Sequence, residues 1–250
     1  MTDLYPSPPH LTIAVWAGSG DELAFGRACD TAVEFGCAPS GAVEVGPRGE
    51  PFAMLQDLED RSTEHLNGAD FDSMVHGGHP VSRPLKAGFR RKGTGTVIVE
   101  HLLGTATEPH PVAISLSAGA LGWPKELSTA KDRKAADRLA AWATDVLRDL
   151  TARTEALYGS IAVEETLPTP TALRTGTPLS TQPFLSTNLP PAVLRAFHTA
   201  FPQSHPTPWP HGTFFPTWKP FANPSTVNRS ALTTASTTLG HALQRRTHEL

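Results

Sequence analysis

Residues 128–157, STAKDRKAADRLAAWATDVLRDLTARTEAL, decide the fold of this chain because they predict one long amphipathic helix. Apolar side chains recur along it at three- and four-residue spacing, which places them on a single face. Thr129 or the serine before it can cap the start, and Gly159 can end the helix. Asp149 and Arg153 stand at i,i+4 in the favourable acid-first order. A helix of about 30 residues is roughly 45 Å long, which suits an element laid across a sheet.

Short segments on both sides of this helix predict β-strands, because they alternate apolar and polar side chains or are rich in β-branched residues. They are residues 11–16, 42–45, 96–103, 112–116 and 160–164. A helix is expected over residues 25–35, where Ser19 and Glu22 fit a capping box at its start. A second short helix is expected near residues 54–58. This order predicts an α+β domain over residues 1–167, with a mostly antiparallel sheet and helices packed on one face.

Residues 168–250 have a different composition. Thirteen of the 24 prolines lie between Pro168 and Pro224. Proline fixes φ and lacks a backbone donor, so we expect an irregular extension with two short helices, at 190–201 and 233–246.

Aromatic side chains indicate that this extension is ordered. Eight Phe and Trp residues fall between Pro183 and Phe221, whereas linkers are poor in aromatics. We therefore expect residues 168–250 to pack on the same domain, with Phe197, Phe201 and Trp218 buried.

The overall composition excludes several classes of function. The formal net charge of −3 argues against general nucleic-acid binding, which needs a basic excess. No apolar run is long enough to span a bilayer and no secretory signal is visible, so a soluble, cytoplasmic protein is expected. In that compartment Cys29 and Cys37 are expected to be free thiols, with Cys29 buried on its helix. We expect no cofactor.

His76-Gly77-Gly78-His79 is the best metal-binding candidate, with His65, Asp70 and Asp72 nearby in sequence. A metal site needs three or four ligands and supporting hydrogen bonds, and the Gly-Gly dipeptide equally suits a turn. We therefore predict no metal.

Residues 90–96, RRKGTGT, form a basic cluster beside a Gly-Thr turn. One interpretation is a contact for phosphate or an acidic partner. The other is a solvated hairpin end whose charges protect a sheet edge, and the lack of an accompanying aromatic platform favours it.

The segment from Trp209-Pro210-His211-Gly212 to Trp218-Lys219-Pro220-Phe221 is chemically the richest. Rigid aromatics beside prolines make good interface anchors, although the same rings can instead complete the core. We predict Trp209, His211 and Trp218 as binding residues.

No complete catalytic set is visible in the sequence, so a non-enzymatic cytosolic protein that binds another protein is the leading hypothesis. An immunity-type inhibitor of a toxin is its most concrete form. The oligomeric state, the identity of the partner and any catalytic activity stay open. The alternative is a hydrolase or transferase with acid–base residues in a cleft between the sheet and the extension. Its candidate residues are His76, His79, His101, Glu164 and His211.

Overall fold

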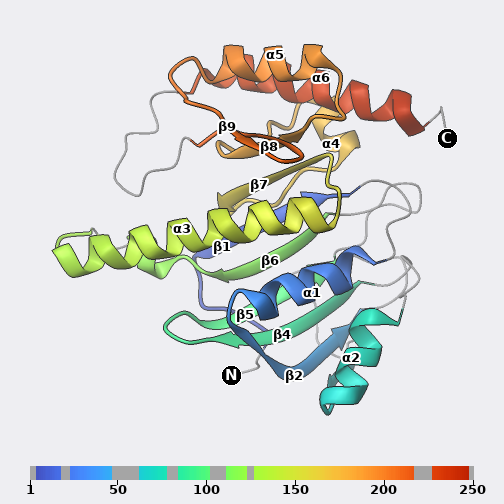
Figure 1. Cartoon of the computed structure of the whole chain (residues 1–250), viewed down its shortest axis with the longest axis vertical. Helices are drawn as coiled ribbons and strands as arrows, with labels where there is room; N and C mark the ends of the chain where they lie inside the picture. Colours follow the sequence, from blue (N-terminus) through green and yellow to red (C-terminus); the bar gives the residue numbers. More distant parts are fainter. Residues whose placement is uncertain are drawn as a thin grey trace.

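One antiparallel sheet runs the length of the molecule (Figure 1). The computed structural model describes residues 4–17, 23–46, 62–77, 84–101, 111–122, 127–216 and 227–247. In that part of the chain the sheet has ten strands. In sheet order they are β3 (Ser62–His65), β2 (Cys37–Val45), β4 (Leu85–Arg91), β5 (Gly95–His101), β6 (Val112–Ser117), β1 (His10–Trp16), β7 (Tyr158–Val163), β8 (Pro183–Ser186), β10 (Gly212–Phe214) and β9 (Thr207–Trp209). The sheet and its helices confirm the α+β class expected from the sequence.

Helices cover both faces of this sheet. Successive side chains of a strand point to opposite faces, and β1 shows the division. Leu11, Ile13 and Val15 join one buried cluster, while Ala14 and Trp16 join another. The first cluster lies under α1 (Ala24–Glu34), α2 (Gly68–His76), the short 3-10 helix η2 (Gly119–Leu121) and α3 (Ala130–Arg153). The second lies under α4 (Pro170–Arg174), α5 (Pro191–Ala200) and α6 (Arg229–Thr247).

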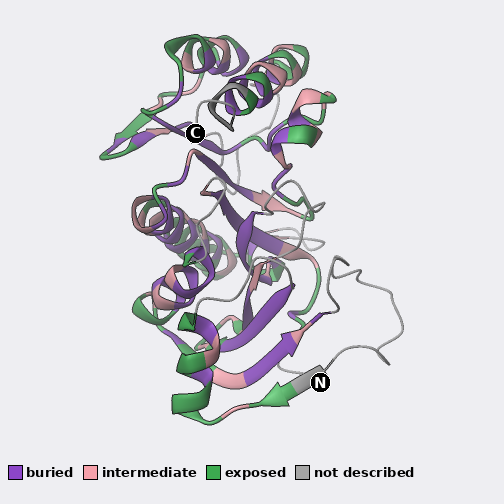
Figure 2. Cartoon of the chain, turned by 90° about the vertical axis from the view of Figure 1, so that its right-hand side faces the viewer, coloured by how far each residue is buried: buried purple, intermediate pink, exposed green. Residues whose placement is uncertain are grey.

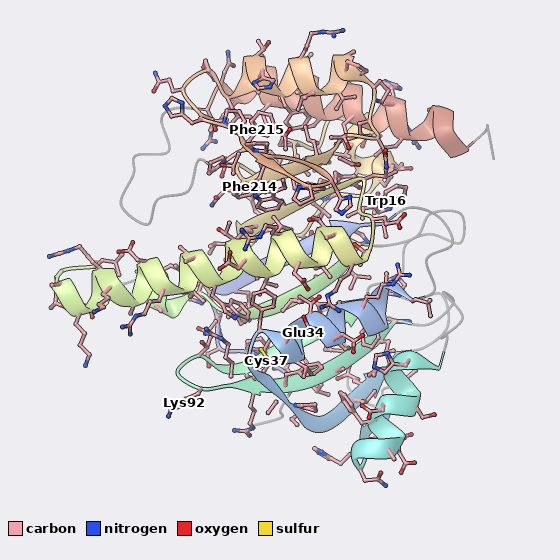
Figure 3. The ribbon with its side chains drawn as sticks, viewed as in Figure 1. Trp16, Glu34, Cys37, Lys92, Phe214 and Phe215 are labelled. Atoms are coloured by element: carbon pink, nitrogen blue, oxygen red, sulfur yellow. The ribbon has the colours of Figure 1, made fainter. Side chains whose placement is uncertain are left out.

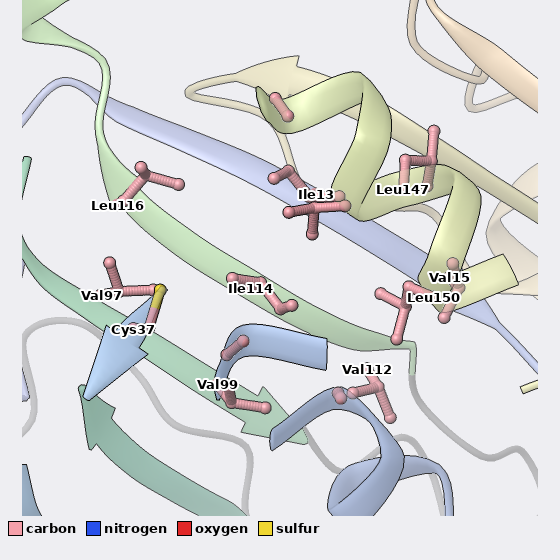
Figure 4. Packing of buried hydrophobic residues seen from close by; sticks show 14 of the residues in the cluster. Ile13, Val15, Cys37, Val97, Val99, Val112, Ile114, Leu116, Leu147 and Leu150 are labelled. Carbon is pink, nitrogen blue, oxygen red and sulfur yellow. The ribbon is translucent and has the colours of Figure 1, made fainter. Parts of the chain in front are cut away.

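Buried positions follow the strands and the inward sides of the helices (Figure 2). At the centre of the first cluster, aliphatic side chains from β1, β5 and β6 meet Leu147 and Leu150 of α3 (Figure 4). Both leucines are fully buried. The apolar stripe of α3 therefore holds the helix on the sheet, as its sequence predicts.

Helix α3 begins where the sequence predicts and ends earlier. Thr129 and Asp132 form a capping box, and hydrogen bonds from Thr129 lower the pKa of the Asp132 carboxyl. The chain leaves the helix through Glu155, whose φ is +50°. Gly159 does not end the helix but lies in β7, where a Cβ would come within 2.8 Å of the Ala14 carbonyl oxygen.

The other predicted strands are confirmed, and β5 pairs antiparallel with β6. In the described residues the N-cap residue of α1 is Leu23, which makes no side-chain capping bond. Ser19, Glu22 and the short helix expected near residues 54–58 lie outside the described residues.

The C-terminal extension is more regular than its prolines suggest. Strand β8 pairs with β7, and β10 then pairs with β8, so the extension continues the sheet. Phe197 and Phe201 are buried as expected, whereas Trp218 lies outside the described residues. The six described Phe and Trp rings of the segment are all at most 9% exposed, so they complete the core.

Both cysteines are free thiols and Cys29 is buried, as expected, and Cys37 is buried as well. Burial raises the pKa of the Cys37 thiol from 9.0 to about 11, against a smaller opposite effect of Arg91. Burial, followed by the charge of Asp30, raises the pKa of Cys29 well above its usual value. Neither thiol is therefore ionised near neutral pH.

We expect the thiol reagent DTNB to label neither cysteine of the folded protein at about pH 8, and both after unfolding in urea. The folded-state pKa of Cys37 lies above the ordinary value of 9.0. The buried neutral thiol therefore contributes fully to stability below pH 9, and this contribution is lost as the pH rises through about 11. A Cys37→Ala variant has no thiol to ionise at this position, so its free energy of unfolding should fall less as the pH rises from 9 to about 11. Rapid labelling of the native protein would contradict the burial of the thiols.

Candidate binding cleft beside the long helix

An open cleft of about 260 Å³ lies over the C-terminal half of α3. The end of α1 and the turn between β9 and β10 supply the rest of its lining. The lining residues are Phe35, Asp145, Arg148, Asp149, Thr151, Ala152, Trp209, Pro210 and His211. We call this the α3 cleft.

The β9–β10 hairpin forms one wall of the cleft, and its base is held by aromatic stacking. The Trp209 ring stacks on Phe214 with centroids 4.6 Å apart and on Phe184 at 5.5 Å. Gly212 allows this approach, since a Cβ there would overlap the Leu185 carbonyl oxygen and lie 2.5 Å from the Phe184 ring. The hairpin is therefore anchored firmly to the sheet.

The turn of the hairpin is exposed. Pro208, Pro210 and His211 are all exposed, while Trp209 between them is 9% exposed. The His211 carbonyl accepts a hydrogen bond of 3.0 Å from the Thr187 N–H, which fixes the turn. A rigid, exposed turn loses little conformational entropy when a partner binds it.

The α1–α3 side of the cleft is held by an ion-pair network. Asp149 accepts hydrogen bonds from Arg153 Nε at 2.6 Å and from Thr31 Oγ1 at 2.9 Å, and Arg153 also contacts Glu34. Burial by itself would lower the pKa of the Arg153 guanidinium, but its hydrogen bonds to the two carboxylates raise that pKa overall. The predicted Asp149–Arg153 pair is thus confirmed, and its contacts with Thr31 and Glu34 fix α1 against α3.

The remaining polar lining is more open to solvent. Arg148 Nη2 lies 2.7 Å from Asp145 Oδ1, and both side chains are about half exposed. Trp142 Nε1 donates a 3.0 Å hydrogen bond to the Phe35 carbonyl, which holds the end of α1. The exposed Arg148–Asp145 ion pair can be exchanged for contacts with a partner at little energetic cost.

The structure brings two of the three predicted binding residues, Trp209 and His211, to one cleft. The third, Trp218, lies outside the described residues. The sequence did not indicate that Phe35, Asp145 and Arg148 line the cleft. They are brought to the cleft only by the packing of α1 and α3, and no local sequence signal marks them.

The residues of the catalytic alternative are dispersed in the described part of the chain. His76 lies on α2, 3.4 Å from Asp30, and Glu164 pairs with His10 at 3.3 Å. His101 ends β5, and His211 adjoins β10. Five strand spacings separate β5 from β10, or about 24 Å. His79 lies outside the described residues.

Over the described ranges, no three His, Cys, Asp or Glu side chains are grouped as metal ligands would be. Asp70 of the metal candidate instead accepts a hydrogen bond from Asn67 at the start of α2. No helix in these ranges is long and apolar enough to span a membrane.

No protein family model and no curated protein matches the chain. Among solved structures the chain is similar to the Pseudomonas aeruginosa T6SS protein PA0821, with a TM-score of 0.44 and 13% sequence identity. The alignment covers 94% of this chain and 72% of that chain.

Proposed function

We propose that this chain is a non-enzymatic cytosolic protein that binds another protein at the α3 cleft. The observation that carries the proposal is the anchored, exposed β9–β10 turn beside a cleft of mixed apolar and polar lining. Protein interfaces use such preorganised surfaces, with a buried apolar element surrounded by polar groups. Trp209 would form the apolar wall, and His211 would contact the partner directly.

The more specific form of the proposal is an immunity-type inhibitor that neutralises a toxin. A stoichiometric inhibitor needs a rigid binding surface and no catalytic residues of its own. The described part of the cleft offers one imidazole, two aspartates and an arginine, and the aspartates are already in ion pairs. These groups suit recognition better than acid–base chemistry.

Site-specific photo-crosslinking tests the proposal. A crosslinking amino acid is placed at His211, and in a separate strain at the exposed Glu64 of β3, at the other end of the sheet. In the native host, position 211 is expected to capture one protein that position 64 does not capture. No protein captured at position 211, or the same proteins captured at both, would overturn the proposal.

The captured protein then gives a quantitative test with purified components. His211→Ala is expected to weaken binding at least tenfold, whereas His205→Ala, an exposed histidine outside the cleft, should leave the dissociation constant unchanged. For the immunity form, expression of the partner alone should stop growth, and co-expression of this chain should restore it. A partner that binds without toxicity would refute only that form.

A further inference from the structure

Cationic side chains are concentrated in two segments far apart in sequence. Residues 90–92 and 131–138 together hold seven Lys and Arg residues and only two carboxylates. The whole chain has 21 cationic and 24 acidic residues. A third of the cationic residues therefore lies in two segments that are positively charged, although the whole chain is negatively charged.

The fold joins these two segments. Arg90 and Arg91 end β4, Lys92 begins the β4–β5 turn, and residues 131–138 form the N-terminal third of α3. The guanidinium of Arg91 lies over the Trp142 ring of α3, 4.4 Å from its centroid. Arg91 also donates a 2.7 Å hydrogen bond to Thr94, which ties the turn to the same contact. The hairpin is thus fixed against the helix.

Helical spacing extends this contact into a basic stripe. Lys131, Lys134 and Arg138 precede Trp142 at intervals of three and four residues, so they share its side of α3. The hairpin and the N-terminal end of α3 project from the same side of the molecule in Figure 1, and Lys92 points outward in Figure 3. We call the set Arg90, Lys92, Lys131, Lys134 and Arg138 the basic surface; all five are exposed.

Four of these five cations keep their charge open to solvent in the described part of the chain. No ion pair there joins Lys92, Lys131, Lys134 or Arg138 to a carboxylate. The Asp132 carboxylate is engaged in capping α3. Like charges three or four residues apart each destabilise a helix by about 0.2–0.5 kcal/mol. An acidic ligand would relieve this repulsion.

We propose that the basic surface is a second interaction site, which docks an acidic segment of a protein. Charge complementarity identifies the partner's chemistry as a segment rich in Asp and Glu. Nucleic acid is a poorer fit, because the ring at this surface, Trp142, is 8% exposed and already covered by Arg91. Ten residues of α3 separate Arg138 from Arg148 of the cleft, or about 15 Å. The two sites can therefore be tested separately.

The test uses the full chain and three fluorescein-labelled probes: a glutamate-rich peptide, the same peptide with glutamine for glutamate, and a single-stranded DNA of equal charge. Fluorescence anisotropy is measured at about 20 mM and about 150 mM salt, since screening grows over this range. The acidic peptide is expected to bind best and to weaken at least tenfold at the higher salt. Tighter binding of the DNA, or no binding of the acidic peptide at low salt, would overturn the proposal.

Matched variants locate the binding. Lys134→Glu/Arg138→Glu is expected to weaken peptide binding at least tenfold, and Lys92→Glu about threefold. Arg195→Glu/Arg229→Glu makes the same change in net charge at exposed positions on α5 and α6 and should change the affinity less than twofold. Equal losses in the two double variants would show nonspecific attraction. If Lys92→Glu leaves the affinity for the peptide unchanged, the hairpin is not part of the binding site.

Discussion

Removal of residues 168–250 is expected to leave residues 1–167 unable to form a stable fold. The truncation deletes β8, β10 and β9, so the backbone donors and acceptors along one side of β7 lose their partners. It also removes α4, α5 and α6 from the sheet face that contains Trp16 and Tyr158. These two rings are at most 6% exposed in the full chain and stack with centroids 5.7 Å apart. Exposure of such a patch favours aggregation.

Size-exclusion chromatography, near-ultraviolet circular dichroism and binding of the dye ANS measure this outcome. The truncated chain should elute as aggregates or as an expanded species that binds ANS and lacks fixed aromatic signals. Limited proteolysis of the full chain is the control, and residues 170–216 should resist cleavage. A monomeric, cooperatively unfolding fragment 1–167 would show instead that the extension is an appendage. We propose that residues 1–167 and their C-terminal extension form a single folding unit.

Phe215→Ala is expected to lower the free energy of unfolding by about 3–5 kcal/mol. The Phe215 ring is fully buried between the extension's strands and α5. It lies 5.4 Å from the Phe201 centroid, 6.2 Å from that of Phe197 and 5.2 Å from that of His198. Truncation to alanine removes these ring contacts and leaves a cavity that fixed backbone elements on both sides prevent from closing.

Urea unfolding measures the change, with Phe215→Leu as a control that keeps most of the side-chain volume. The leucine variant is expected to lose less than half as much stability, because it fills most of the space. A loss below about 1 kcal/mol for Phe215→Ala would mean that the second cluster is loosely packed.

Local patterns predicted the fold class well, because strands and helices have different apolar periodicities. The stripe of α3 and the alternation in β1 are local in sequence, and each fixes one element. The helices expected at 190–201 and 233–246 are present as α5 and α6. Helices were expected on one face of the sheet, however, and these two cover the other face together with α4. Proline content suggested irregular structure after residue 168, but Pro170 lies at the start of α4, where proline is tolerated.

The candidate cleft was predicted only in part. Trp209 stands out because its ring lies between two prolines, and His211 because its imidazole directly follows the second of them. Phe35 and Arg148, by contrast, look like ordinary helix residues. Their place in the cleft depends on how α1 and α3 meet, which involves residues more than a hundred positions apart, such as Thr31 and Asp149. A local pattern contains no such information.

The position of β1 in the sheet has a consequence during protein synthesis. Strand β1 is made first, yet both of its neighbours, β6 and β7, are encoded far downstream, at residues 112–117 and 158–163. At about 5–20 residues per second, roughly 8–30 s pass between translation of β1 and of β7. Both edges of the apolar segment LTIAVW are unpaired on the ribosome until β6 emerges, and the edge that β7 will occupy stays unpaired throughout the interval. We therefore expect the unpaired edges of β1 to need chaperone protection on the ribosome until β7 emerges from the exit tunnel.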